Sequence, residues 1–103
     1  MRIYISGPIS GVPDYKTQFD GFAHLIALLG HTPVNPARHP AGLSRREYMR
    51  MDLADLMACD AVYMLHGWMS SGGALVERAL AKYLDMKIFY RLEEIPDESE
   101  PES

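Results

Sequence analysis

The sequence predicts one α/β domain built on a doubly wound parallel sheet of four to five strands. Short β-favouring segments alternate with helical segments between residues 2 and 90, in the order βαβαβαβ. Parallel strands joined by helices form right-handed crossovers, which place helices on both faces of the sheet. The chain has 103 residues, enough for one domain with a single core.

The first half of the chain supplies two strands and two helices. Residues 2–6 are β-favouring and end at a tight Gly-Pro loop, and residues 14–30 carry apolar side chains at three- and four-residue spacing before a glycine. Residues 31–35 predict a second strand, which the following proline ends. Ser44 and Glu47 form a capping box, so a second helix is expected to begin there.

The second half repeats this alternation. Residues 60–65 form an almost continuous apolar run, typical of a central parallel strand that helices cover on both faces. The order continues with a Gly- and Ser-rich loop at 66–73, a helix at 74–84 and a strand at 86–90. The expected result is a three-layer sandwich of the flavodoxin-like or Rossmann-like kind.

Charge is unevenly distributed along the chain. Residues 1–90 carry nine Lys or Arg and eight Asp or Glu, whereas residues 91–103 carry one Arg and six acids. The acidic composition predicts a disordered tail over 91–103, after a domain of residues 1–90. The nearly neutral domain argues against a nucleic-acid polymer as partner, because such binders carry a basic excess.

The cysteine, the histidines and the apolar stretches of the sequence exclude further classes of protein. The single cysteine, Cys59, excludes an internal disulfide and favours a reducing, cytoplasmic location. No apolar stretch near the start is long enough for a signal peptide or a membrane span, so no membrane partner is predicted. The four histidines lack the paired spacing of a zinc site, and neither a metal nor a cofactor is predicted.

The expected fold locates the ligand site. In doubly wound sheets, ligands bind outside the carboxyl ends of the strands, where the strand order reverses. Loops 6–13, 35–44 and 66–73 should therefore surround the site. The last of these precedes a helix, whose free N–H groups suit a phosphate or carboxylate. Its glycines could equally serve the turn alone.

Two carboxylates are candidates for chemistry. Glu77 lies near the start of the helix after 66–73, where an ionised, partly buried carboxylate is a competent nucleophile toward an anomeric carbon. Alone, it is as readily an ordinary first-turn acid. Asp52 falls close to the apolar stripe of its helix, and a buried carboxylate needs a partner. Asp55 is expected to face solvent, and Asp60 to accept from backbone N–H groups of its turn.

Three motifs together resemble the nucleoside 2-deoxyribosyltransferase superfamily over about residues 2–90. They are Tyr4-Ile-Ser-Gly-Pro-Ile9, Asp52 eight residues before Asp60, and Ser71-Gly-Gly-Ala-Leu-Val-Glu77. Within the superfamily, the sequence is most similar to small deoxyribosyltransferase-like domains of unknown function from phage and bacterial genomes. The deoxynucleoside 5′-monophosphate N-glycosidases come next.

The resemblance implies roles for individual residues. Glu77 matches the nucleophile that forms a glycosyl-enzyme ester, Asp52 the acid that assists the departing base and orients the sugar, and Tyr4 the tyrosine that holds the nucleophile. Ser71 matches a serine that binds the 5′-phosphate. The implied substrate-binding residues are Ser6, Gly7, Pro8, Ile9, Gly11, Ser70, Ser71, Gly72 and Gly73.

The implied function is N-glycosidic bond cleavage or deoxyribosyl transfer in nucleotide metabolism, with a small-molecule nucleoside or nucleotide as partner. Water as acceptor gives hydrolysis and a second base gives transfer, and the sequence leaves both open. The family's habit of building sites at subunit interfaces predicts a homodimer or homotetramer. Two alternatives remain: a non-catalytic nucleotide-binding or sensing module, and a structural α/β domain whose motif residues only pack.

Overall fold

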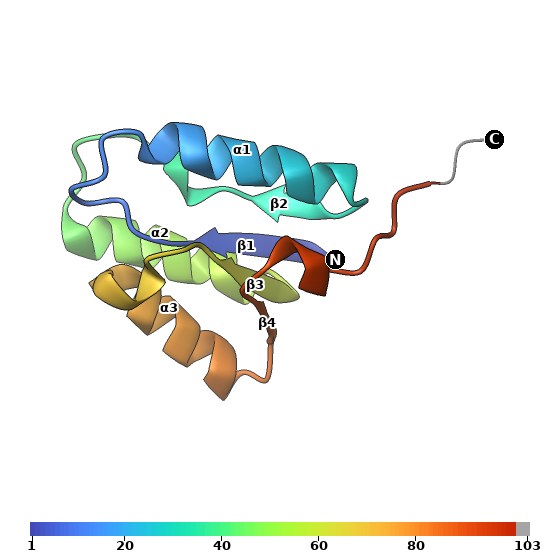
Figure 1. Cartoon of the computed structure of the whole chain (residues 1–103). Helices are drawn as coiled ribbons and strands as arrows, with labels where there is room; N and C mark the ends of the chain where they lie inside the picture. The colour runs from blue at the N-terminus through green and yellow to red at the C-terminus, as the bar shows by residue number, and fades with distance from the viewer. Residues whose placement is uncertain (101–103) are drawn as a thin grey trace.

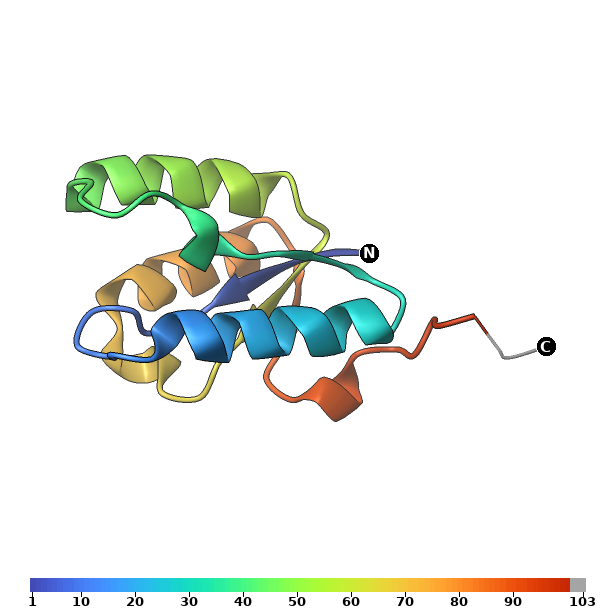
Figure 2. The same cartoon turned by 90° about the horizontal axis from the view of Figure 1, so that it is seen from above.

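The computed structural model describes residues 1–100 and has a central sheet between two layers of helices (Figures 1 and 2). The predicted alternation of four strands and three α-helices is confirmed, with three short 3₁₀ helices (η) added. The elements are β1 (Arg2–Ser6), α1 (Tyr15–Leu28), β2 (Thr32–Val34), η1 (Pro36–Arg38), α2 (Arg45–Met57), β3 (Ala61–Met64), η2 (Trp68–Ser70), α3 (Gly72–Tyr83), β4 (Lys87–Phe89) and η3 (Leu92–Glu94). None of the helices within residues 1–100 is long and apolar enough to cross a membrane.

The sheet is parallel throughout, with the strand order β2-β1-β3-β4. After β1 the chain moves outward to β2, and it then returns across β1 to place β3 on the other side. The strand order therefore reverses between β1 and β3. The loops that leave these two strands diverge to opposite faces, which opens a crevice at their carboxyl ends.

The two faces of the sheet have different cores. Side chains alternate along a strand, so Ile3 and Ile5 of β1 join the apolar cluster under α1, whereas Tyr4 joins the cluster under α2 and α3. Figure 1 shows α1 on one face of the sheet and the other two helices on the opposite face. The two helical layers of the predicted three-layer sandwich are thus present on either side of the sheet.

The start of α2 has the predicted capping box. Ser44 Oγ accepts from the N–H of Glu47 at 3.1 Å, and Glu47 Oε1 accepts from the N–H of Ser44 at 3.2 Å. These two bonds satisfy N–H groups that have no partner within the helix. They fix where α2 begins, and so which of its side chains reach the crevice.

The segment 92–98 packs against the domain, so the predicted disordered tail is wrong there. Ile95 is 4% exposed and joins the apolar cluster under α1. The N–H of Glu98 donates to the carbonyl oxygen of Leu29 at 2.8 Å, beside the end of α1 (Figure 2). One buried apolar side chain and backbone bonding outweigh the acidic composition on which the prediction relied. The part of that prediction on residues 101–103 lies outside the described residues.

Candidate active site

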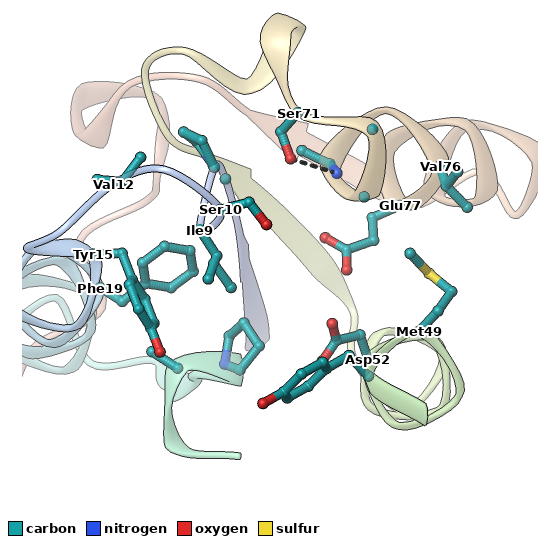
Figure 3. Close-up of a pocket in the computed structure, with 18 of the residues that line it drawn as sticks. Ile9, Ser10, Val12, Tyr15, Phe19, Met49, Asp52, Ser71, Val76 and Glu77 are labelled. Carbon is teal, nitrogen blue, oxygen red and sulfur yellow. Dashed lines mark hydrogen bonds between the residues drawn. The ribbon is translucent and has the colours of Figure 1, made fainter. Parts of the chain in front are cut away.

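A cavity of about 990 Å³ lies at the predicted edge of the sheet. Its walls come from the loop after β1, the start of α1, the segment from η1 into α2, and the start of α3. Figure 3 shows Ile9 and Tyr15 on one side, with Met49 and Val76 on the other. The three loops expected around the site therefore do meet there.

Glu77 is fixed in the wall of this cavity by two hydroxyl groups. Its side chain comes from α3 and is 5% exposed. Tyr4 Oη donates to Oε2 at 2.9 Å, and Ser6 Oγ donates to Oε1 at 2.6 Å. Tyr4 and Ser6 are two residues apart on β1, so both point to the same face of the sheet. One strand thus orients both oxygens of a single carboxylate.

The surroundings of Glu77 shift its protonation toward neutral pH. Desolvation by burial raises the pKa of Glu77 to about 7, although the hydrogen bonds from Ser6 and Tyr4 act to lower it. The charge of Asp52 adds a smaller upward effect. Burial, followed by the charges of Glu77 and Asp52, raises the pKa of Tyr4 above its ordinary value, so its phenol remains a donor.

Asp52 faces the same cavity from α2. Its side chain is 13% exposed, and Figure 3 shows the carboxyl groups of Asp52 and Glu77 opening to one space. Burial raises the pKa of Asp52 to about 6, while His39 acts to lower it and Asp55 to raise it. Two carboxyl groups with unequal affinity for a proton therefore share this cavity.

Most of the residues predicted to bind substrate line the cavity. They are Gly7, Pro8, Ile9, Gly11, Ser70, Ser71, Gly72 and Gly73. The exception is Ser6, which is buried behind the wall and bonds Glu77 instead. Its position on β1 makes it a neighbour of the carboxylate rather than a lining residue.

Both serines of the Gly-rich loop have local hydrogen bonds. Ser71 is the N-cap of α3, and its Oγ accepts from the N–H of Ala74 at 3.2 Å. Ser70 Oγ donates to the carbonyl oxygen of Gly67 at 2.8 Å. The Ser71 hydroxyl keeps its own proton for a ligand, because a cap uses only the oxygen lone pair. The loop is thus held in shape before anything binds.

Sequence reasoning missed His39, Tyr48 and Met49, which also line the cavity. His39 Nε2 lies 3.0 Å from Asp55 Oδ2, so Asp55 has a partner and does not simply face solvent. His39 precedes its α2 partners by thirteen and sixteen residues, and no local spacing links them. Asp60 accepts from a backbone N–H as predicted, but from a different one: its Oδ2 accepts from the N–H of Arg2 on β1 at 2.8 Å, not from a residue of its own turn.

The family follows from the whole domain rather than from the site. A family model described as "Domain of unknown function (DUF4406)" matches residues 1–90. The chain belongs to this family. The description names no activity for DUF4406 domains, and this DUF4406 chain matches no curated protein. Within its described residues 1–100, no group of three or more His, Cys, Asp or Glu side chains could hold a metal ion.

A solved structure shares the fold of this DUF4406 chain. The chain is similar to the "2-desoxiribosyltransferase from Leishmania mexicana", with a TM-score of 0.68 and 20% sequence identity. The match covers 84% of this chain and 61% of that one. At this identity the likeness shows a shared fold. The DUF4406 chain spans less than two thirds of that protein.

Proposed function

We propose that this chain cleaves the N-glycosidic bond of deoxynucleosides or of their 5′-monophosphates, with Glu77 as nucleophile. The observation that carries the proposal is the buried Glu77 carboxylate, whose two oxygens accept from Tyr4 and Ser6. Asp52 lies across the same cavity. Most enzymes that hydrolyse glycosidic bonds use a pair of carboxyl groups. The deoxyribosyltransferase-like fold supports the same substrate class.

The reaction would proceed in two displacements. In the first, an ionised oxygen of Glu77 bonds to C1′ while the bond from C1′ to the base breaks. The base leaves with the bonding electrons and takes a proton from Asp52. In the second, water or another base attacks C1′ and gives its proton to the Asp52 carboxylate, and the ester bond to Glu77 breaks. Tyr4 and Ser6 hold the carboxylate in place, so little reorganisation is needed at the moment of attack.

This mechanism sets a pH dependence. It needs Glu77 ionised and Asp52 protonated, and their pKa values are about 7 and about 6. The two conditions overlap most between these values, so kcat/KM is expected to follow a bell-shaped profile with its maximum at about pH 6.5. Because Glu77 holds its proton more tightly than Asp52, the required pair is a minority state even at the maximum. At lower pH the ionised form of Glu77 becomes rarer, and at higher pH the protonated form of Asp52 does.

The cavity lining offers two kinds of contact that suit the two ends of a nucleotide, and the apolar kind comes from opposite sides of the cavity. Ile9, Tyr15 and Met49 offer apolar and aromatic surface to a base. The start of α3 and Arg45 offer N–H groups and a positive charge to a 5′-phosphate. We expect phosphate to strengthen substrate binding more than it changes the chemical step.

The predicted homodimer or homotetramer stays part of this proposal. Apolar side chains on the outer side of α3 are open in the monomer, and Tyr83 is 85% exposed. An apolar helix face of this kind favours association between copies. Analytical ultracentrifugation of the full chain would show a dimer or tetramer if the prediction holds, and a monomer at all concentrations if it does not.

The test is a chromatographic screen for free base. The full chain is incubated with each common deoxynucleoside and its 5′-monophosphate, with and without a second base, beside Glu77→Gln and the surface variant Glu93→Gln. The proposal expects base release by wild type and Glu93→Gln but not by Glu77→Gln. A new nucleoside would identify a transferase. Ligand binding by calorimetry without any base release would instead identify a binding module and overturn the enzyme proposal.

A further inference from the structure

His39 occupies an unusual position between two carboxylates of α2. Its Nε2 lies 3.3 Å from Asp52 Oδ1 and 3.0 Å from Asp55 Oδ2. Asp52 faces the cavity, whereas the Asp55 side chain is 39% exposed. The mechanism above uses only Asp52. The histidine and the outer carboxylate are therefore unexplained by it.

Neither contact is a well-formed hydrogen bond. Among the described residues, His39 Nε2 and Asp52 Oδ1 are both buried side-chain atoms without a hydrogen-bond partner. One ring nitrogen carries at most one proton, so it cannot donate a linear bond to two carboxylates together. Buried polar atoms without a hydrogen bond cost stability, and the charge of a protonated His39 beside two carboxylates offsets part of that cost. At 3.3 and 3.0 Å, His39 Nε2 is near enough to both carboxylates for a proton to pass between them.

The backbone around His39 holds this arrangement in place. Asn35 caps η1 by accepting from the N–H of Ala37 at 3.0 Å. Just after His39, the carbonyl oxygen of Pro40 accepts from Tyr48 Oη at 2.7 Å. The imidazole therefore enters from a loop that is anchored on both sides, while α2 fixes the two carboxylates.

We propose that His39 is a positioning residue that passes protons from solvent-facing Asp55 to cavity-facing Asp52. The inference rests on the proposed function, in which Asp52 gives its proton to the departing base. In the resting protein, when Asp52 is ionised, Asp55 takes a proton from solvent and transfers it to the Nε2 lone pair. The imidazolium then gives the Nε2 proton to Asp52 and returns to its neutral form. One proton has moved from solvent to the acid, and His39 and Asp55 are unchanged.

The charges around Asp52 predict in which direction each variant shifts the pKa of Asp52. The groups that face it are His39 from the loop after η1, Asp55 on its own helix, Glu77 on α3 and Tyr4 on β1, and Arg45 lines the same cavity. The positive charge of His39 lowers the pKa of Asp52, and the negative charge of Asp55 raises it. Removing one neighbour or the other should therefore move the Asp52 titration in opposite directions.

The experiment is a carbon-13 NMR titration of the Asp52 carboxyl in the full chain, with its signal assigned through Asp52→Asn. His39→Gln keeps a donor without an ionisable ring, and we expect it to move the Asp52 midpoint up by about one pH unit. Asp55→Asn should move the midpoint down by a smaller amount, because His39 affects the pKa of Asp52 more than Asp55 does. His24→Gln, an exposed histidine on α1, is the matched control and should leave it in place.

Movement in opposite directions supports the inference. Midpoints that stay in place, that move in the same direction, or that move equally in His24→Gln overturn it. If one variant does not fold, the direction observed in the other decides. The titration needs no turnover, so its result stands even if no substrate is found. Where base release is measurable, its pH optimum should rise in His39→Gln and fall in Asp55→Asn, which a purely structural role would not produce.

Discussion

The two faces of the sheet use one strand for different purposes. On the α1 side, Ile3 and Ile5 of β1 pack into an apolar cluster. On the other side, Tyr4 and Ser6 from the same strand hold the buried carboxylate of Glu77. The first face gains stability from apolar burial, while the second buries a group that water would solvate better. On the α1 face β1 thus contributes apolar packing alone, whereas on the opposite face it also holds a buried ionisable group in place.

The largest expected effect comes from Glu77→Gln, on the polar face. The variant keeps the shape of the side chain but cannot form an ester, so base release should fall about 10⁴-fold, or about 5 kcal/mol in the barrier. Initial rates by chromatography, with thermal unfolding in parallel, measure this. Activity within tenfold of wild type, in a folded variant, would remove Glu77 from the mechanism.

The next effect belongs to the apolar face. Ile26 of α1 is fully buried and lies outside the cavity. Ile26→Ala should lower the free energy of unfolding by about 3 kcal/mol, because it removes buried methyl and methylene groups and leaves a void. Urea denaturation measures the loss. Activity per folded molecule should stay unchanged, and a large drop in it would show that the two faces are not separable.

A smaller effect is the pH dependence of stability that Glu77 causes. Its pKa is about 7 in the folded chain against an ordinary value of 4.5, so the folded state binds this proton more tightly than the unfolded state. The stability of wild type should therefore fall as pH rises from about 4.5 to about 7, by about 2 kcal/mol relative to Glu77→Gln. Urea denaturation of both proteins at several pH values measures the difference. Parallel curves would mean that burial does not raise this pKa.

The smallest effect is expected from Tyr4→Phe. The change removes the donor to Glu77 Oε2 and leaves Ser6 as the remaining partner. Base release should fall about tenfold, and the Glu77 limb of the pH profile should move up, because a bond that favours the ionised form is lost. Tyr83→Phe, on an exposed tyrosine of α3, is the matched control. If the pH profile of Tyr4→Phe matched that of wild type, Tyr4 would have a packing role alone.

Local sequence patterns predicted much of the fold. The capping box at Ser44 and the alternation of elements follow from contacts between residues near one another in the chain, which sequence patterns report. The docking of the acidic segment was missed, since it depends on Ile95 entering a cluster assembled from distant strands and helices. Composition alone cannot report such a contact.

The candidate site divides in the same way. The cavity and most of its lining follow from strand order and from the motifs that end at Glu77. The neighbours of His39 do not, because a loop and a helix meet there only after the chain has crossed the sheet. Ser6 was expected to meet substrate. Ser6 lies on the same face of β1 as Tyr4, and its hydroxyl therefore bonds Glu77 instead. Only the pairing of β1 with its neighbouring strands reveals this contact.

The most direct test of the central claim is the capture of the covalent intermediate. Wild type is mixed with the best substrate from the screen, quenched in acid within the first turnover and digested for mass spectrometry. The account predicts a deoxyribosyl ester, with the 5′-phosphate where the substrate carries one, on the peptide that contains Glu77. It also predicts that Glu77→Gln shows none. Base release at full rate with an adduct on another residue, or with direct attack by water and no adduct under any quench, would contradict the nucleophilic role of Glu77.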